Sequence, residues 1–433
     1  MSASTRTALV AALGVALLAL AWALHARGDL LDHAGDYVLL AAGMLAVCAA
    51  GTSLLWRRAS QRDVVIVLVV ALAARAVLAF DAPTLSNDVY RFAWDGRVQA
   101  AGTNPYRYAP ADEALRALRD GEVFPRLNRP RTRTLYPPAN EVFYVAAHEA
   151  GGYSVRSVKL ALLAIEAVVV ALLLVLLRRA RLSPGRVVLY AWQPLAIVEI
   201  AASGHSEPLL IVLTLAALLA WDARAQLTAG LALGAAALTK FAPALVAPFF
   251  FRTLRWRFAA AFAGIVALLY APYLNAGTAA LGSLSEYADE GFGAGPFRWL
   301  TVGAGLPEDP VRVLLLTALA GAALLAAYRP PRDLVEACRY TALLFAGALL
   351  AGHLVLPWYA LWLLPLLCVA PVPALLWVTS TISVYYLTMT EELIAQDVAS
   401  VVVWGPTIAL LVYDAVRARR RPAQPRAEIV GAT

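Results

Sequence analysis

Long apolar runs follow one another along the whole chain and are separated by short polar connections. A run of about 20 apolar residues is long enough to cross a bilayer as a helix, which satisfies its backbone hydrogen bonds internally. Of the 433 residues, 61% are hydrophobic and only 15% are charged, whereas soluble globular chains carry roughly a quarter charged residues. The sequence therefore predicts an all-α polytopic membrane protein.

The runs predict about 12–14 membrane-spanning helices in one integral membrane domain over residues 1–433. Three N-terminal spans lie within 1–80, a large external loop with interfacial helices follows at 81–157, the remaining bundle takes 158–416, and a basic tail occupies 417–433. The single runs lie near residues 7–24, 37–56, 63–80, 158–177, 187–203, 207–221, 257–274, 311–328, 338–356, 359–370, 372–388 and 397–416.

Arginine-rich connections set the predicted orientation. The segments WRRASQR, RRARLSPGR and RARRRPAQPR are basic, and basic connections stay on the cytoplasmic side. The loop at 81–157 and the acidic segments at 275–309 and 390–397 then lie outside. The same clusters account for the net charge of +7 without a nucleic-acid partner. We therefore expect a multi-pass protein of the inner (plasma) membrane with its active site on the extracytoplasmic side.

Residues 227–251 form an ambiguous apolar run, because Thr239 and Lys240 interrupt it and Pro243 and Pro248 follow. A single pass would put the basic segment FRTLRWR outside, whereas two short passes return it to the cytoplasm. We predict the broken hairpin, with Lys240 at its outer tip. Broken helices at membrane depth usually line a cavity or pack against protein.

The stretch at 86–110, SNDVYRFAWDGRVQAAGTNPYRYAP, is the polar and aromatic start of the external loop. A helix is predicted from Asp88 to just before Gly102, because glycine accepts the left-handed helix exit. Asp88, Arg91 and Asp95 then project from one face, so two carboxylates flank one guanidinium. This pattern favours a catalytic role for Asp88 and Asp95. The alternative is an ion-pair ladder that only holds the shape of the loop.

Cations and aromatic rings accompany this face. Tyr90 and Arg97 lie on the adjacent face of the same predicted helix. This arrangement suits a helix that lies in the membrane interface. Arg107 follows, and several arginines occupy residues 126–133. Guanidinium groups bind phosphate well, so the cluster predicts an anionic partner. Each arginine taken singly also fits a solvated or headgroup-binding face.

Further candidates lie at predicted external ends of spans. His205 and Glu207 belong to SGHSEP, where His205 is able to bond a sugar hydroxyl or a phosphate. The alternatives are a core histidine and a glutamate that only complements the next helix dipole. His353 precedes Trp358 and Tyr359, whose rings suit a sugar or prenyl site or, alternatively, an interface belt.

Charged residues inside spans are costly and usually pair with one another or face a cavity. Arg75, Glu166 and Glu199 fit this description, and a pair of Arg75 with Glu166 or Glu199 is the alternative in which these charges only hold the structure. Lys240 is instead placed to meet a lipid phosphate at headgroup depth, because it lies at the tip of the predicted hairpin.

The sequence predicts no cofactor and no metal. The three cysteines lie in or beside apolar runs without CxxC spacing, so neither a disulfide framework nor a zinc site is indicated. The phosphate-binding glycine loops of nucleotide enzymes are missing from the sequence. A divalent ion between Asp88 and Asp95 would compete with Arg91, which already neutralises them.

Four stretches, in this order, resemble the GT-C superfamily of polytopic glycosyltransferases. They are the loop stretch at 86–110 with LYPP downstream, AWQPLAIVEIAASGHSEPLL, ALTKFAPALVAPFF and PWYALWLLPLL. More narrowly, they resemble the bacterial glycosyltransferase family 87, whose members use polyprenol-phosphate-mannose. The resemblance implies a sugar donor on polyprenyl phosphate, reaction on the extracytoplasmic face, and an acidic loop residue as base, a role that falls on Asp88.

Together these observations predict inverting transfer of a sugar, mannose by resemblance, to a glycolipid or glycan acceptor, with membrane lipids as surroundings. Asp88 would take the acceptor proton, while Lys240, Arg97 or Arg107 would hold the donor phosphate. The candidate contacts to sugar or acceptor are Arg91, Tyr90, His205, Glu207, His353, Trp358 and Tyr359.

The alternative function is a transporter or flippase of a lipid-linked sugar or anionic substrate. That class predicts related halves, each with a discontinuous helix that contributes to a midplane site. The sequence has one broken hairpin and one long asymmetric loop, a pattern that favours the transferase.

Overall fold

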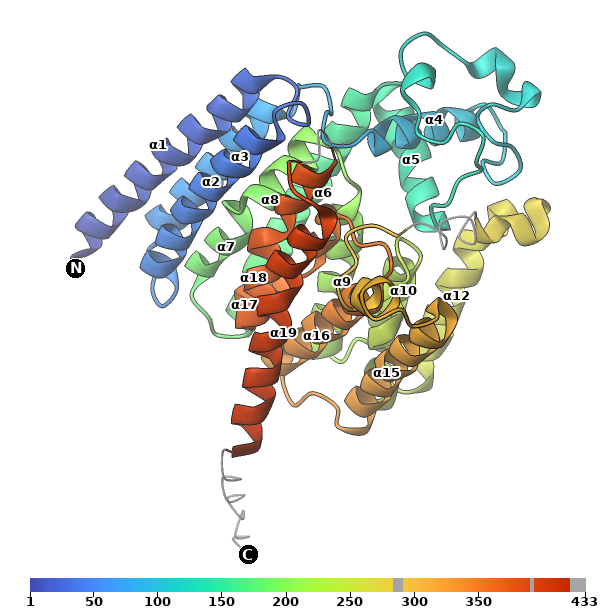
Figure 1. Ribbon diagram of the computed structural model, residues 1–433. Coiled ribbons are helices and arrows are strands. Elements are labelled where there is room, and N and C mark those ends of the chain that lie inside the picture. Colours follow the sequence, from blue (N-terminus) through green and yellow to red (C-terminus); the bar gives the residue numbers. More distant parts are fainter. Residues whose placement is uncertain (283–290, 390–392, 421–433) are drawn as a thin grey trace, which may run out of the picture.

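The computed structural model describes residues 1–282, 291–389 and 393–420 (Figure 1). Within these ranges the regular structure is helical, with only isolated bridges between Phe292 or Gly293 and Leu354. The predicted all-α class is confirmed. Several predicted acidic positions of the outer segments, Glu286, Asp289, Glu290, Glu391 and Glu392, lie outside the described residues, as does the end of the basic tail.

Three antiparallel helices begin the chain: α1 (Ala3–Arg27), α2 (Ala34–Leu55) and α3 (Gln61–Leu78). Helices α1 and α3 approach closely at Gly14, where an added Cβ would clash with Val70. Ser60 and Asp63 form a reciprocal capping box at the start of α3, and Asp63 also pairs with Arg6 of α1 at 2.9 Å. These contacts fix the end of the bundle away from the large loop.

The segment between α3 and α6 folds as a cap on one end of the bundle, at the upper right of Figure 1. It contains α4 (Asp88–Ala100), the short helices η1 (Glu113–Leu118) and η2 (Phe124–Arg126), and α5 (Pro138–Gly151). Its own apolar core stacks Phe92 on Tyr144, with ring centroids 4.6 Å apart, and buries Trp94. This core holds α4 rigidly against α5.

The middle of the chain alternates long and broken helices. Helix α6 (Val155–Arg179) packs against α9 (Glu207–Asp222). Between them, the predicted run at 187–203 is interrupted at Pro194, because proline lacks the N–H that a continuous helix needs. Its parts are η3 (Pro184–Val187), α7 (Val188–Ala191), α8 (Pro194–Ile197) and η4 (Val198–Ala202), the last a π-helix.

The predicted hairpin is confirmed by the packing of its neighbours. Helix α10 (Gln226–Ala237) runs parallel to α12 (Trp256–Tyr270), because Gly230 faces Ala261 and Gly234, one turn later, faces Ile265. The connecting segments η5 (Ala242–Val246) and α11 (Ala247–Leu254) must therefore return to the end at which α10 began.

A hydrogen bond joins the end of the returning helix α11 to the end of α9. Trp221 Nε1 in the last turn of α9 donates to Thr253 Oγ1 in the last turn of α11, at 2.8 Å. Lys240 consequently lies at the opposite tip, beside the cap.

The rest of the chain completes the bundle. Its elements are η6 (Ala271–Leu281), α14 (Pro296–Arg298), η7 (Trp299–Gly303), α15 (Glu308–Tyr328), α16 (Leu334–Ala351), η8 (Pro357–Trp362), α17 (Leu364–Val369), α18 (Pro373–Thr381), η9 (Ile382–Thr388) and α19 (Gln396–Arg420). Among the described residues, seven helices are long and apolar enough to cross a membrane. Helix α3 is 18 residues long but carries three charged side chains, Arg62, Asp63 and Arg75, and is not among the seven. The remaining predicted runs form shorter helices or segments broken by proline.

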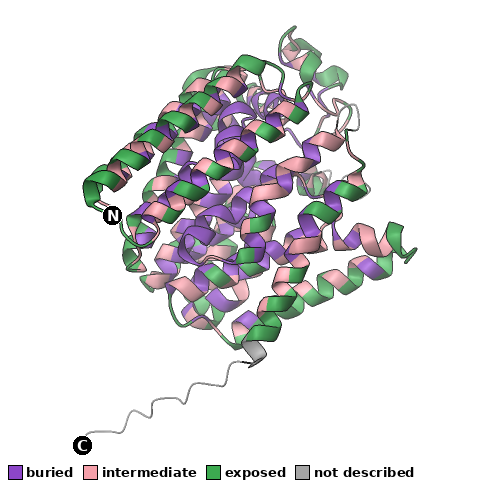
Figure 2. Cartoon of the chain, turned by 60° about the vertical axis from the view of Figure 1, so that its left-hand side comes forward, coloured by how far each residue is buried: buried purple, intermediate pink, exposed green. Residues whose placement is uncertain are grey.

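Burial separates the inside of the bundle from its outer faces, as Figure 2 shows. Large apolar side chains on the outer faces remain exposed, among them Leu39 and Leu72 at about 70% and Leu324 at 64%. Apolar surface of this kind is suited to contact with lipid. The outer faces therefore agree with a membrane-embedded bundle.

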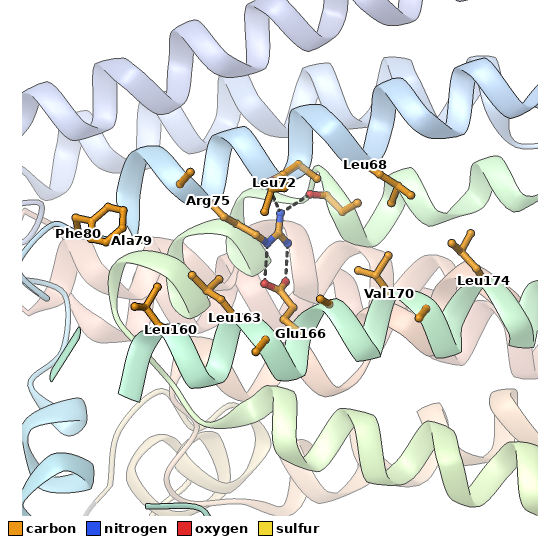
Figure 3. A pocket seen from close by; sticks show the side chains of 16 residues that line it. Leu68, Leu72, Arg75, Ala79, Phe80, Leu160, Leu163, Glu166, Val170 and Leu174 are labelled. Carbon is orange, nitrogen blue, oxygen red and sulfur yellow. Dashed lines mark hydrogen bonds and ion pairs between the residues drawn. The ribbon is translucent and has the colours of Figure 1, made fainter. Parts of the chain in front are cut away.

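An apolar groove of about 630 Å³ runs between α3 and α6 (Figure 3). Arg75 and Glu166 meet at its floor in a two-pronged ion pair, with N–O distances of 2.7 and 2.6 Å. Arg75 also donates to the carbonyls of Ala71 and Ala191, and Tyr190 donates to Glu166. Of the two partners predicted for Arg75, the structure selects Glu166.

Replacing Glu166 with Ala should destabilise the protein by about 3–5 kcal/mol, because Arg75 would remain buried without its counter-ion. The double change Arg75→Met with Glu166→Leu should recover most of this loss. Unfolding of the purified protein in detergent measures both. The matched control is Arg332→Ala, which removes an exposed pair with Glu336 and should cost less than about 1 kcal/mol. Equal losses in Glu166→Ala and the control would contradict the prediction.

Candidate active site

A cavity of about 200 Å³ lies where the cap meets the hairpin tip and η8. It gathers segments that are far apart in sequence: the start of α4, the LYPP segment, the turn before η5, and η8 with the residue before it. The lining residues are Asp88, Leu135, Tyr136, Pro137, Thr239, Lys240, Phe241, Ala242, Leu356, Trp358, Tyr359 and Trp362. Its walls are mostly apolar and aromatic, with one carboxylate and one ammonium group.

Asp88 is the first residue of α4, and its side chain is only 15% exposed. Asn128 Nδ2 donates to Asp88 Oδ1 at 2.6 Å. Burial raises the pKa of the Asp88 carboxyl above its ordinary value, while Lys240, the Asn128 hydrogen bond and Arg129 partly offset this rise. A carboxylate with a raised pKa is a stronger base than an exposed aspartate.

Lys240 lies at the hairpin tip. Two backbone carbonyls of the tip accept hydrogen bonds from the cap. Asn140 Nδ2 donates to the carbonyl of Thr239 at 2.7 Å, and the Ala139 amide donates to that of Leu238 at 3.1 Å. The Lys240 ammonium pairs with Glu207 at the start of α9. The predicted position of Lys240 at the tip is thus confirmed.

Aromatic rings cover the other side of this ammonium group. Lys240 Nζ lies 4.3 Å from the ring centroid of Tyr359 and 5.7 Å from that of Trp362. Rings in this position stabilise a cation through its attraction to the π face. Tyr359 and Trp358 both line the cavity.

His205 lies directly behind the cavity and is 1% exposed. Its ring stacks on Trp358 with centroids 3.7 Å apart, and its Nδ1 lies 4.0 Å from Asp88 Oδ2. Burial, followed by the charge of Lys240, holds the pKa of His205 well below its ordinary value, which favours the neutral imidazole. His205 contacts the cavity residues without lining the cavity itself.

Asp95 belongs to a different, fully buried network. Arg91 Nε donates to both carboxylate oxygens of Asp95, at 2.9 and 3.0 Å, and Arg91 also donates to the carbonyl of Thr132. Glu141 lies in the same network and accepts from Thr134 at 2.7 Å. Asp95 and Arg91 therefore form an ion pair, as the alternative interpretation of the sequence predicted for this helical face. The structure does not bring either of them to the cavity.

Four other predicted residues also lie away from the cavity. Arg97 pairs with Asp120 at 3.6 Å and covers the ring of Tyr153. Arg107 is exposed beside Tyr108. Tyr90 is 8% exposed, with the guanidinium of Arg126 5.6 Å from its ring centroid, and His353 lies near Phe297. A phosphate at Lys240 would therefore not also meet Arg97 or Arg107 in this arrangement.

Sequence reasoning missed two residues that the fold places beside the candidate site. Asn128 reaches Asp88 from 40 positions along the chain, and Glu199 Oε2 lies 3.5 Å from His205 Nε2. The sequence offered only a weak signal for Glu199, which is a costly charge within an apolar run. Nothing in the local pattern around Asn128 distinguishes it from an ordinary loop asparagine.

A family model described as alpha-(1→6)-mannopyranosyltransferase, N-terminal domain, matches residues 2–256. This stretch is more than half of the chain and contains Asp88, His205 and Lys240. The chain belongs to this family. Membership indicates a mannosyltransferase, and it confirms the resemblance drawn from the loop, SGHSEP and ALTKFAP stretches. No curated protein and no solved structure matches the chain.

The cavity of this mannosyltransferase combines a base and a cation within one mostly apolar space. Asp88 is suited to accept a proton, and Lys240 is suited to hold an anion. Among the described residues, no three His, Cys, Asp or Glu side chains gather as metal ligands would.

Replacing Lys240 with Met should destabilise the mannosyltransferase by about 1–3 kcal/mol, because the Glu207 carboxylate is buried and would lose its cation. Adding Glu207→Gln should restore part of the loss, since the amide carries no charge to compensate. Thermal unfolding in detergent of the single and double variants measures this coupling. Simple additivity of the two single changes would show that the pair does not stabilise the fold.

Proposed function

We propose that the protein transfers a mannosyl group from a polyprenyl-phosphate donor to a glycolipid or glycan acceptor on the extracytoplasmic face. The observation that carries the proposal is the shared cavity of Asp88 and Lys240. An acceptor hydroxyl beside Asp88 and a donor phosphate beside Lys240 would place the anomeric carbon between them. Such an arrangement supports a single displacement with inversion.

In this mechanism Asp88 removes the acceptor proton as the hydroxyl oxygen attacks the anomeric carbon. The bond from that carbon to the phosphate oxygen breaks, and its electron pair leaves with the polyprenyl phosphate. Lys240 stabilises the charge that grows on the phosphate, which is an interaction strongest in the transition state. Inversion with an α-linked product, as in the family name, requires a β-linked donor.

The aromatic wall supports a lipid donor. Phe241, Tyr359 and Trp362 offer apolar surface next to the ammonium group of Lys240, so a prenyl chain could leave the phosphate along them. Trp358 would lie nearest the sugar, since it is held by the stack on His205. A nucleotide sugar is a poorer fit, because the basic connections favour an extracytoplasmic position for this end of the bundle.

The family description also suggests the acceptor position. An α-(1→6) linkage uses the primary hydroxyl of a mannose, which is the least hindered hydroxyl of the ring. We include this linkage in the proposal.

Replacing Asp88 with Asn should lower sugar transfer by about 10²–10⁴-fold, because the amide cannot accept the proton. The measurement is transfer of labelled mannose from polyprenyl-phosphate-mannose in membranes at matched expression, with EDTA added in parallel. We expect the wild-type activity to survive EDTA.

The matched control is Asp112→Asn, which changes another aspartate of the cap outside the cavity. It should leave transfer within about twofold. A fully active Asp88→Asn variant would refute the assignment of the base. If the wild type transferred no mannose from this donor, the donor proposal would fail.

Replacing Asn128 with Ala should move the acidic limb of the pH–rate profile to higher pH. The Asn128 hydrogen bond favours the charged form of Asp88 and so lowers its pKa. Its loss raises that pKa further, and the base is then protonated at a higher pH. Asn104→Ala is the control, since Asn104 bonds to Tyr273 and Asn275. A limb that stays in place in Asn128→Ala would contradict the prediction.

A further inference from the structure

The apolar groove between α3 and α6 shares no lining residue with the candidate active site. It begins at Phe80 and Leu160, at the end of the bundle that carries the cap. It ends at Leu68 and Leu174, deeper in the bundle (Figure 3). The rims are exposed, with Leu72 at 70% and Phe80 at 59%. The groove therefore opens sideways to the surroundings of the bundle, which in a membrane are lipid chains.

The floor of the groove suits an apolar occupant. Nε and Nη2 of Arg75 donate to Glu166, and Nη1 donates to the carbonyls of the floor residues Ala71 and Ala191. Tyr190 also donates to Glu166. Because both charged groups are already paired and hydrogen-bonded, neither needs a polar ligand. A hydrocarbon chain above them would exclude water, and electrostatic interactions strengthen when water is excluded.

The length of the groove matches one leaflet of a bilayer. At about 1.5 Å per residue, α6 rises about 21 Å between Leu160 and Leu174. The hydrocarbon core of a bilayer is about 30 Å thick, so one leaflet contributes about 15 Å. The groove is therefore long enough for a lipid chain from the leaflet on the cap side. It is too short for a partner helix that spans the whole membrane.

A cation lies at the cap end of the groove. Arg156, in the first turn of α6, is exposed, and its guanidinium carbon lies 4.5 Å from the ring centroid of Phe80. Among the described residues no carboxylate pairs with it. The nearest acidic residue in sequence to Phe80, Asp81, is bonded to His25 at 2.8 Å. The ammonium group of Lys159 donates to the Asp81 carbonyl. The mouth of the groove thus offers one unpaired guanidinium, a group that binds phosphate well.

We propose that the groove between α3 and α6 binds an anionic phospholipid from the leaflet on the cap side. One acyl chain lies in the groove above Arg75 and Glu166, and the phosphate lies beside Arg156. Phe80 contacts the upper part of the chain and holds the guanidinium against its π face. The proposal goes beyond the transfer reaction and does not depend on it, because this binding needs neither donor nor acceptor.

The phospholipid would not compete with the proposed sugar donor. Leu160 lines the groove, whereas the preceding Lys159 packs beside Gly204, next to His205. Each site also has its own cation, Lys240 in the cavity and Arg156 at the groove. A lipid held by one cation therefore leaves the other free.

Photochemical labelling tests the headgroup contact. The whole chain is placed in phosphatidylcholine nanodiscs that contain a phosphatidylglycerol probe with a diazirine on one acyl chain, and peptide mass spectrometry locates the label after illumination. We expect the label on α3 and α6 within the groove. Arg156→Gln should lower it about fivefold, the effect typical of one arginine on an anionic lipid. The matched control, Arg178→Gln, changes an exposed arginine at the other end of α6 and should stay within about twofold.

Ala167→Phe tests the groove itself. Ala167 lines the groove and is exposed, so the larger ring would occupy the space of the chain without entering the core. Labelling should fall about tenfold or more. Val168→Phe is the matched control, because Val168 is the next residue of α6, is 49% exposed and does not line the groove. It should keep its labelling within about twofold.

Thermal unfolding in detergent gives a second measurement on the same variants. A ligand that binds only the folded state stabilises it, so added phosphatidylglycerol should raise the unfolding midpoint of the wild type more than phosphatidylcholine does. This difference should disappear in Arg156→Gln and in Ala167→Phe. The wild-type comparison of the two lipids stands even if one variant folds poorly.

Three results would overturn the proposal. Equal labelling by phosphatidylglycerol and phosphatidylcholine probes, unchanged in Arg156→Gln, would show an ordinary surrounding lipid only. Labelling that survives in Ala167→Phe would place the chain outside the groove. Stronger labelling by a polyprenyl-phosphate probe would assign the groove to the sugar donor instead. None of these results changes the outcome of the Asp88→Asn experiment, which tests the transferase proposal separately.

Discussion

The ion pair between Lys240 and Glu207 is the interaction on which the candidate site depends. It joins the tip of a broken hairpin to the first turn of α9, and both segments meet beneath the cap. A carboxylate that is buried at the end of an apolar helix needs a counter-ion. Because the hairpin breaks at residues 238–241, the lysine reaches this carboxylate while its ammonium group still lines the cavity. One charge pair thus serves both the fold and the proposed anion site.

Buried charges in this chain fall into two physical classes. The pair of Arg75 and Glu166 is bonded on all sides and lines a groove that is otherwise apolar. Around His205, by contrast, several buried polar atoms lack partners, including atoms of Glu199, Ser203 and Glu207. Complete pairing rigidifies a bundle, whereas incomplete pairing leaves groups ready to bind substrate or move protons. The contrast supports the proposed site independently of any motif.

Much of the fold could be predicted from the sequence because its signals are local. The apolar runs anticipated the helices, and the proline and lysine near residue 240 indicated a break that the structure shows as a hairpin. Asp88 and Lys240 could be singled out for the same reason. The other assignments depended on where side chains point after packing. Asp95 shares a helical face with Asp88 in projection, yet Arg91 draws it into a buried network, and Arg97 turns to Asp120.

The order of residues alone is enough to recognise a helical membrane protein with one long polar segment, because hydropathy acts residue by residue along the chain. It also determined the family, through motifs that keep their order. Which charged side chains meet depends on the packing of the helices. Asn128 joins Asp88, Glu199 joins His205, and Glu166 rather than Glu199 joins Arg75. Two of these pairings join residues that are 40 and 91 positions apart, which helix packing sets and no local pattern records.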